Sequence, residues 1–447
     1  MTLSFWQREK DSNPHIRSQS PLCYLYTIPL YLMRKRYYTQ IRRKVKDFFL
    51  SLCVWVRVWY NAVMRGGVPM NDNLSARHMV IAGGGAGGLC AAIAAAKAGA
   101  RVTILEKANR VGKKLLKTGN GRCNLSNRNV APEGYNHPGF VAPLLERTGC
   151  AELLDFFASL GLWTVTDAEG RVYPVSDTAA SVLDVLRLGC AALGAEERCS
   201  AEVAAVRPGK KGFTVSLWEG GELSADRVVV AAGGSTALLR PLGHKTVPFS
   251  PVLCPLKTDA DPIRGLSGLR VKCRASLPAR DVEMRGELLF RDFGISGILA
   301  LDLSRFAQNG DVLSLDLLPD VPEDELIRRL AAQAALREND AELFTGIFHR
   351  RLGEAILRRS PGRESAALAR TIKDYRLTVL GPGDVQNAQV TRGGAAVDGF
   401  DPLTLESRLI PGLYCIGEAL DIDGRCGGYN LHWAFSSGLA AGRSAAL

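Results

Sequence analysis

Apolar and polar positions follow a regular order from about residue 78 onward, and this order predicts a strand, a helix and a second strand. The run His78–Ala82 is short and apolar, which is typical of a strand buried in a parallel sheet. After a Gly-rich turn, residues 89–98 are rich in small side chains that favour a closely packed helix, and Gly99 is a natural stop for it. Arg101–Glu106 is a second apolar strand. Together these segments predict a strand–helix–strand unit with parallel strands.

A similar pattern returns near the C-terminus. Residues 412–416 form another apolar run, and Gly417-Glu418 follow as the bend that ends the strand. Gly427-Gly428 then open a last helix, which begins near Tyr429. Both ends of the chain therefore predict a buried strand, a Gly-containing turn and a helix.

The segments between these ends change character twice. Helical apolar spacing is found at 151–160 and 179–193, a hairpin is expected at 163–174, and strands of one meander are expected at 200–206, 213–218 and 227–232. From about residue 256 the pattern turns to short strands at 268–276, 286–290 and 312–317, then to helices over 322–369, and back to a strand at 375–379. No segment repeats at a fixed period, which excludes a solenoid.

The Gly-rich turn has the spacing of a dinucleotide-binding fingerprint. Gly83 permits the tight turn, Gly85 lets the backbone approach a pyrophosphate, and Gly88 lets the helix pack close to the strand. The helix N-terminus offers free N–H groups and the positive end of a dipole to the phosphates. An acid at the end of the second strand can accept hydrogen bonds from both ribose hydroxyls. The contacts predicted here are Gly83, Gly85, Ala86, Gly87, Gly88, Glu106 and Lys107.

The C-terminal segment favours FAD over NAD or FMN, because it supplies a second site for one extended dinucleotide. An acidic side chain at the Gly417 bend can bind ribityl hydroxyls, and backbone N–H groups at the start of the last helix can face the flavin pyrimidine edge, where negative charge gathers on reduction. The contacts predicted here are Gly417, Glu418, Gly428, Tyr429, Asn430 and Leu431. For His432 a packed helix histidine is the preferred interpretation over a proton donor.

Several motifs resemble one bacterial family. The run Gly112-Lys-Lys-Leu-Leu-Lys-Thr-Gly-Asn-Gly-Arg-Cys-Asn-Leu-Ser-Asn127, the segments 390–394 and 405–409, and the C-terminal segment are similar to signatures of the NAD(P)/FAD-dependent oxidoreductase (aminoacetone oxidase) family. This family includes flavoproteins assigned as reductases of conjugated bile-acid intermediates. The resemblance extends from about residue 75 to the end of the chain.

The resemblance implies an α/β fold, in which a two-part FAD-binding Rossmann-like domain holds an inserted small β-barrel-like domain that carries a helical insertion. The expected segments are 1–70, a basic extension; 75–255, the first part of the FAD-binding domain; 256–320, the first part of the barrel domain; 321–370, the helical insert; 371–388, the return of the barrel; and 389–447, the second part of the FAD-binding domain.

The basic loop 113–127 has the residues expected beside a flavin. Its lysines can neutralise the diphosphate, its glycines allow close backbone approach, and Arg122 and Asn124 can donate to ring carbonyls. Cys123 has no partner at Cys-x-x-Cys spacing, so we interpret it as a packing residue rather than a redox thiol. The contacts predicted from this loop and from the resemblance are Lys114, Gly121, Arg122, Asn124, Val203 and Gly233.

Two departures from the family pattern limit the comparison. Gly234 is followed almost directly by Leu242-Gly-His244, where relatives usually have a longer Gly-rich stretch. Relatives often carry Thr-His where this chain has Arg291-Asp292, so no substrate role for that histidine is transferred. No catalytic residue is assigned, and the six histidines show no metal-ligand spacing, so no metal is expected.

The net charge of +11 lies mainly in one segment. Residues 1–70 contain twelve Lys and Arg against three Asp and Glu, so the rest of the chain is nearly neutral and a basic nucleic-acid groove is not expected. We interpret this segment as a non-native extension with Met70 as the start of the protein, and the alternative is a membrane-surface anchor.

The apolar stretch 48–64 is interrupted by Arg57, so no membrane-spanning helix is expected. Eleven cysteines without paired spacing favour a cytoplasmic protein.

Two function classes follow. The first is an FAD-dependent oxidoreductase of a small organic molecule, which either reduces an activated double bond or oxidises an amine. No second dinucleotide fingerprint is present, so NAD(P)H as electron donor would visit the substrate face of the flavin and leave. The second is a flavoprotein that acts on a macromolecular partner such as tRNA. The near-neutral body of the chain favours the first, and the oligomeric state and the substrate stay open.

Overall fold

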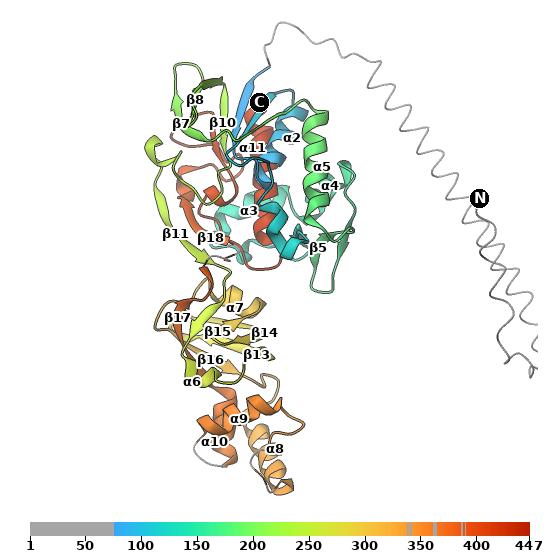
Figure 1. Cartoon of the computed structure of the whole chain (residues 1–447), viewed down its shortest axis with the longest axis vertical. Coiled ribbons are helices and arrows are strands. Elements are labelled where there is room, and N and C mark those ends of the chain that lie inside the picture. Colours follow the sequence, from blue (N-terminus) through green and yellow to red (C-terminus); the bar gives the residue numbers. More distant parts are fainter. Residues whose placement is uncertain (1–75, 338, 340–341, 361–363, 386–387, 389) are drawn as a thin grey trace, which may run out of the picture. The chain divides into compact units, whose positions relative to one another are not determined.

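The computed structural model of the chain describes residues 76–337, 339, 342–360, 364–385, 388 and 390–447. The basic segment 1–70 and its expected start at Met70 lie outside these residues. Figure 1 shows the described elements with the labels used below. Within this described part of the chain, no helix combines the length and the hydrophobicity that crossing a bilayer requires.

A five-stranded parallel sheet forms the centre of the first domain. Its strand order is β19-β10-β1-β2-β6, and all neighbouring pairs run parallel. Apolar side chains of the three central strands are buried, as expected for a sheet covered on both faces. The strands are β1 (His78–Ala82), β2 (Arg101–Glu106), β6 (Glu196–Cys199), β10 (Arg227–Val230) and β19 (Leu413–Cys415). Because β19 comes from the C-terminal segment, the domain is built from both ends of the described chain, which confirms the two-part Rossmann-type fold.

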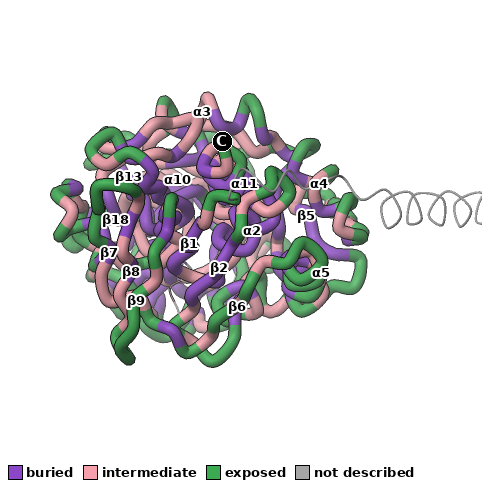
Figure 2. The backbone as a smooth tube through the Cα atoms, turned by 90° about the horizontal axis from the view of Figure 1, so that it is seen from above, coloured by how far each residue is buried: buried purple, intermediate pink, exposed green. Residues whose placement is uncertain are grey.

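Two helices from opposite ends of this domain pack with their backbones almost in contact. Helices α2 (Ala86–Lys97) and α11 (Tyr429–Ala446) lie side by side in both views of Figures 1 and 2. A Cβ atom on Gly438 would lie 2.3 Å from the carbonyl oxygen of Gly87. A Cβ atom on Gly442 would likewise lie 2.3 Å from the carbonyl oxygen of Ala91. Only glycine permits this approach. Helix α5 (Ala179–Ala192) lies on the same side of the sheet in Figure 2.

A three-stranded antiparallel sheet accompanies the parallel sheet. It consists of β7 (Val203–Pro208), β8 (Phe213–Leu217) and β9 (Glu222–Ala225). The prediction that residues 227–232 form the third strand of this meander is wrong, because β9 takes that place and β10 lies between β1 and β19. Exposed and covered positions alternate along β9, whereas three consecutive valines of β10 are fully buried, which suits a central parallel strand.

The segment between β2 and α5 forms a small helical and hairpin layer. The predicted hairpin is confirmed as β4 and β5, which pair antiparallel, and β3 adds a third strand. The predicted helix at 151–160 is confirmed as α4. The elements are β3 (Ser126–Asn127), α3 (Pro138–Arg147), α4 (Cys150–Ser159), β4 (Thr164–Thr166) and β5 (Arg171–Pro174).

The inserted domain contains a closed barrel of six strands in the order β12-β15-β14-β13-β16-β17, which confirms the barrel expected from the resemblance. From Cys273 to Leu277, buried positions alternate with partly buried ones along β13 because one face of the strand points into the barrel. Strands β11 (Thr246–Val252) and β18 (Val390–Ala395) form a two-stranded ribbon that leads into and out of this domain. The barrel elements are β12 (Leu256–Thr258), α6 (Ala260–Ile263), β13 (Arg270–Leu277), β14 (Val282–Arg291), β15 (Gly294–Ser296), α7 (Ile298–Leu303), β16 (Val312–Asp316) and β17 (Tyr375–Pro382).

The helical insertion lies between β16 and β17, and its described residues include α8 (Glu323–Leu336), α9 (Arg350–Arg359) and α10 (Ser365–Lys373). The Lys373 ammonium at the end of α10 donates to Asp316 at 2.8 Å and to the Leu318 and Val321 carbonyls at 2.9 and 2.8 Å, which ties the helices to the barrel. The buried apolar residues of the barrel and of these helices form one cluster, and those of the parallel-sheet domain form another.

Candidate functional site

The carboxyl ends of four parallel strands bring the predicted cofactor segments to one edge of the sheet. Strand β1 runs into Gly83, β2 ends at Glu106, β10 runs toward Gly233, and β19 runs into Gly417 and Glu418. Open α/β sheets usually bind their ligands at this edge, next to a strand whose two neighbours follow it in opposite directions across the sheet. Strand β1 is such a strand here, since β2 lies on one side of it and β10 on the other.

The N-terminus of α2 is open toward this edge. Its N-cap residue is Gly85, no side chain caps it, and its first turn holds no acid. A Cβ atom on Gly85 would meet nothing within 4 Å, whereas one on Gly88 would lie 2.0 Å from the Gly83 carbonyl oxygen. The turn therefore packs tightly on its inner side and leaves room on its outer side. Uncapped amides beside open space fit the expected pyrophosphate.

Glu106 is held in place by backbone amides on both sides. One carboxylate oxygen accepts from Gly84 N at 2.8 Å, and the other accepts from Ala108 N at 2.8 Å. Each oxygen keeps a second lone pair, so the carboxylate can still accept from the two hydroxyls of a ribose. The neighbouring Lys107 is exposed. Ala201 N donates to the Glu106 carbonyl at 2.9 Å, which brings the half-buried Val203 close to this end of β2.

An ion pair joins the basic loop to the C-terminal bend. Lys114, which is largely exposed, contacts the carboxylate of the more buried Glu418. A Cβ atom on Gly233 would lie 3.8 Å from the same carboxylate. All three residues were predicted from the sequence as cofactor contacts, and the structure brings them together.

The basic loop is braced against its neighbours through two of its predicted site residues. The Arg122 guanidinium donates to Asp177 at 2.6 Å and lies 4.3 Å from the ring centre of Tyr173. With its amide oriented to satisfy its neighbours, Asn124 donates to the Val172 and Ser126 carbonyls at 3.2 and 2.9 Å and accepts from Gly428 N at 3.1 Å. Both side chains thus hold the loop together in this structure. Close to them, Gly121 has a positive φ of 85° and open space around it.

Cys123 lies inside this loop as a fully buried side chain. Burial raises the pKa of its thiol to about 12. A thiol that stays protonated at neutral pH is a poor nucleophile, and this supports its interpretation as a packing residue.

The start of α11 is organised by hydrogen bonds to backbone groups. Gly428 precedes the helix with a φ of 105°, and its N–H donates to the Asn124 amide oxygen. The Tyr429 hydroxyl donates to the Asn129 carbonyl at 2.6 Å, and the Asn430 amide exchanges hydrogen bonds with the backbone of Gly424 at 2.8 Å. The half-buried Leu431 follows. Among the described residues, no side chain accepts from the amides of Tyr429, Asn430 and Leu431, and free amides at a helix N-terminus fit the predicted contact with the flavin pyrimidine edge.

His432 is fully buried one turn into α11. One ring nitrogen lies 3.1 Å from the Thr148 carbonyl, and the other lies 2.9 Å from the Ser126 hydroxyl. Because a carbonyl can only accept, the first nitrogen carries a proton. Burial lowers the pKa of His432 to about 4. These contacts support the packed-histidine interpretation.

We expect this histidine to make the protein sensitive to acid. Its folded pKa of about 4 lies below its ordinary value of 6.5, so its stabilising contribution is complete above pH 6.5 and is lost as the pH falls toward 4. The loss amounts to about 3 kcal/mol of unfolding free energy. Urea unfolding at pH 7.5 and 4.5 measures it, and His432→Gln should show a flatter pH dependence than the unmodified protein. Equal pH dependence in both proteins would contradict this assignment.

A group of charged residues that was not predicted from the sequence lies next to the C-terminal bend. Asp421 and Asp423 are buried, and the Asp423 carboxylate pairs with both Arg305 and Arg392. Asp302 lies close by, and burial raises the pKa of its carboxyl to about 6. Two aspartates separated by one residue were the available signal, but nothing in the sequence identifies Arg305 and Arg392 as the partners of Asp423.

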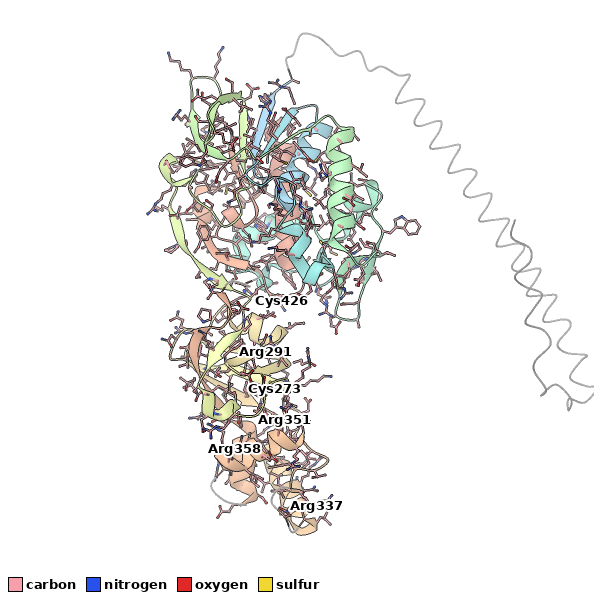
Figure 3. The ribbon with its side chains drawn as sticks, in the orientation of Figure 1. Cys273, Arg291, Arg337, Arg351, Arg358 and Cys426 are labelled. Carbon is pink, nitrogen blue, oxygen red and sulfur yellow. The ribbon has the colours of Figure 1, made fainter. Side chains whose placement is uncertain are left out.

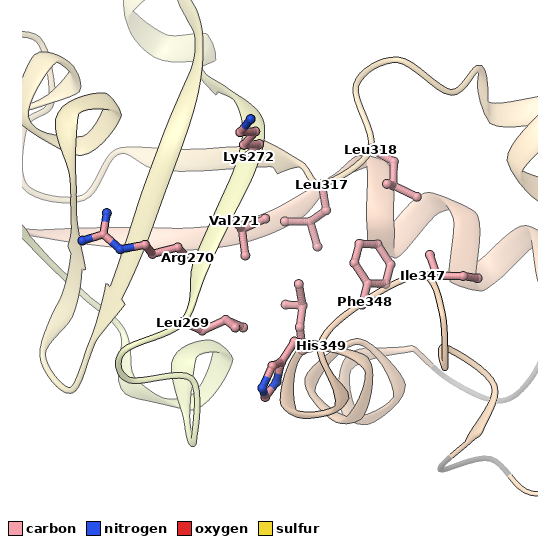
Figure 4. Close-up of a pocket in the computed structure, with 10 residues that line it drawn as sticks. Leu269, Arg270, Val271, Lys272, Leu317, Leu318, Ile347, Phe348 and His349 are labelled. Carbon is pink, nitrogen blue, oxygen red and sulfur yellow. The ribbon is translucent and has the colours of Figure 1, made fainter. Parts of the chain in front are cut away.

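A separate pocket of about 270 Å³ lies in the inserted domain. Figure 4 shows Leu269 and Val271 of the barrel facing Phe348 and Ile347 of the helical insertion. All predicted cofactor contacts lie on the other domain, so this pocket is not part of the candidate site.

Comparisons with known proteins identify the family of the chain. Residues 77–444 match the family model described as the HI0933-like protein Rossmann domain. The chain is 37% identical over 405 residues to the 3-dehydro-bile acid delta(4,6)-reductase of Clostridium scindens, with 82% of this chain and 98% of that protein covered. It is 30% identical over 388 residues to the ribosomal RNA dihydrouridine synthase of Escherichia coli, with 81% of this chain and 96% of that protein covered. Among solved structures, an open flavocytochrome c3 fumarate reductase aligns with a TM-score of 0.43 at 18% identity, covering 87% of this chain and 80% of that one.

Proposed function

Because the chain belongs to the HI0933-like Rossmann family and is an FAD-dependent oxidoreductase, we propose that it reduces a carbon–carbon double bond conjugated to a carbonyl group. The observation that carries this proposal is the similarity to the delta(4,6)-reductase along 98% of that protein's length. A delta(4,6)-reductase and a dihydrouridine synthase, by their names, both add hydrogen to carbon–carbon double bonds. This shared chemistry favours reduction over amine oxidation.

In this proposal the residues at the carboxyl edge divide the binding of FAD among them. The first-turn amides of α2 bind the pyrophosphate, and Glu106 orients the adenosine ribose. Glu418, with Lys114 beside it, holds the ribityl region. FAD, when bound, supplies the hydride transfer.

The N-terminus of α11 stabilises negative charge at the pyrimidine edge. The Tyr429 hydroxyl already donates to the Asn129 carbonyl, and burial raises the pKa of this phenol. We therefore assign Tyr429 to holding the site rather than to protonating the substrate. NAD(P)H is the proposed electron donor and reaches the site without a domain of its own.

The first candidate substrate is a small molecule that contains a conjugated ketone. Residues 71–447 hold 44 Lys and Arg against 42 Asp and Glu, so this part of the chain lacks the excess of positive charge that usually binds a polyanion. A second candidate is the reduction of a uracil base within RNA, which the similarity to the Escherichia coli synthase favours.

All nine described cysteines are free, which supports a cytoplasmic location.

The test uses the full protein, purified with its bound cofactor under anaerobic conditions. NADH or NADPH should bleach the flavin absorbance near neutral pH. A 3-oxo-4,6-diene steroid should then restore that absorbance, whereas the matched saturated 3-oxo steroid should not. Flavin reduction by amines with reoxidation only by oxygen would contradict the proposal. Reoxidation by unmodified ribosomal RNA alone would favour the second candidate.

A further inference from the structure

The segment Asp421 to Gly428, called here the flavin loop, is held by side chains from the inserted domain. Asp302, in the last turn of α7, accepts a hydrogen bond from Cys426 N at 2.6 Å. Arg305 follows three residues later and donates to the Asp423 carboxylate at 2.7 Å and to the Asp423 carbonyl at 3.0 Å. Figure 3 labels Cys426 on this loop, beside elements of the barrel. Two side chains of one short segment thus reach two backbone positions of the loop.

The Asp423 carboxylate holds the contact between Arg305 and the flavin loop rigidly in place. It is fully buried, and Arg305 beside it is 5% exposed. Arg392 of β18 donates to both oxygens of the same carboxylate, at 2.7 and 3.1 Å, and also contacts the Arg305 carbonyl. A buried carboxylate with two guanidinium partners has little freedom to rearrange, since a lost partner leaves an uncompensated charge.

The first domain holds the same loop from its other side. Asn136 accepts from Asp423 N at 2.9 Å and donates to the Asp421 carbonyl at 3.1 Å. Arg425 N donates to the Gly134 carbonyl at 2.9 Å. Between Arg425 and the N-cap of α11 lie Cys426 and Gly427, and Cys426 is the residue that Asp302 anchors. The inserted domain therefore acts on the last stretch before the helix.

We propose that Asp302 is a positioning residue, which fixes the flavin loop through Cys426 N and thereby places the N-terminus of α11 against the flavin. This inference rests on the proposed function, because it takes α11 to face the flavin pyrimidine edge. Asp302 acts through the loop backbone and is not assigned any contact with substrate. Arg305 supports the same loop through Asp423.

The surroundings of Asp302 suit this role. Burial raises the pKa of its carboxyl to about 6, and the hydrogen bond from Cys426 N and the charges of Arg305 and Arg425 oppose this rise. Cys426 and Tyr429 also face this carboxyl, and its charge raises the pKa of both groups further. A poorly solvated acceptor forms a stronger hydrogen bond with an amide than an exposed one does.

Hydrogen exchange of the FAD-loaded full protein tests the proposal. Asp302→Ala removes the acceptor, so the amides of residues 423–428 should exchange about tenfold faster, the usual effect of losing one bond to a charged acceptor. FAD should also dissociate faster, and the vibrational fine structure of its visible absorbance band should weaken. Asp302→Asn keeps an acceptor oxygen and should restore most of the protection. Asp320→Ala, which alters an exposed carboxylate of the same domain, should match the unmodified protein.

The outcomes separate this inference from the proposed function. Unchanged exchange and FAD dissociation in Asp302→Ala would overturn it, and so would a loss in Asp302→Asn as large as that in Asp302→Ala. If Asp302→Ala fails to fold, Arg305→Lys tests the proposal instead. This variant keeps a positive charge beside Asp423 but cannot reach both its carboxylate and its carbonyl. The amides of residues 423–428 must then exchange faster. A protein that binds FAD, shows these effects and reduces no conjugated ketone contradicts the proposed function alone.

Discussion

Gly438→Val should cost about 4 kcal/mol of unfolding free energy and should release FAD from the purified protein. The Cβ atom alone would lie 2.3 Å from the Gly87 carbonyl oxygen and 3.0 Å from the Gly87 carbonyl carbon. Both belong to the backbone of α2, so no side chain can rotate away, and α11 must move off the helix that carries the predicted pyrophosphate site. Urea unfolding and the absorbance ratio of flavin to protein measure the two effects.

Gly139→Val is the matched control for this substitution. Gly139 lies in the first turn of α3, and a Cβ atom there meets nothing within 4 Å. This variant should unfold within about 1 kcal/mol of the unmodified protein, as substitutions away from packed contacts do. Similar losses in both variants would show that glycine at 438 has no special packing role.

Glu106→Ala should weaken FAD binding at least about a hundredfold while the protein stays folded. The substitution removes the two predicted charge-assisted bonds to the ribose, each of which contributes about 1.5–3 kcal/mol. It also frees the Gly84 and Ala108 amides that the carboxylate now holds at 2.8 Å. Titration of the apoprotein with FAD, followed by quenching of flavin fluorescence, gives the dissociation constant.

Glu219→Ala is the control, since this residue is exposed in the turn after β8. Its dissociation constant should equal that of the unmodified protein. If Glu106→Ala also keeps that value, the carboxylate serves only to hold the turn, and its predicted contact with ribose is wrong.

Much of the fold could be predicted because local patterns and tertiary structure agree. Apolar runs predicted β1 and β2, small residues predicted α2, and the change of pattern near residue 256 marked the barrel. The third strand of the meander was assigned wrongly because β9 and β10 are neighbouring short runs with β character, and the strand expected there was placed on β10 instead of β9. The valines of β10 carried the signal, since a continuous buried run favours the parallel sheet.

The candidate site could be predicted in its segments but not in its connections. Glu106, Lys114, Gly233 and Glu418 were each expected to contact the cofactor, and the structure places them at one edge of the sheet. The side chains of Arg122 and Asn124 were expected to point at a flavin, and in the structure they bond to Asp177 and to backbone groups. Their cofactor contacts stay predictions.

The sequence by itself determined what depends on near neighbours in the chain. Strand and helix character, the fingerprint turn at Gly83 and the bend at Gly417 follow from backbone freedom and from the spacing of apolar residues. The tertiary structure alone decided which distant groups meet: Gly438 on Gly87, Lys114 on Glu418, and Asp302 on Cys426 N. The physical reason is that hydrogen bonds and close packing require atoms within a few ångströms. Pairs separated by more than a hundred residues reach such distances only when the strand order and the inserted domain are in place.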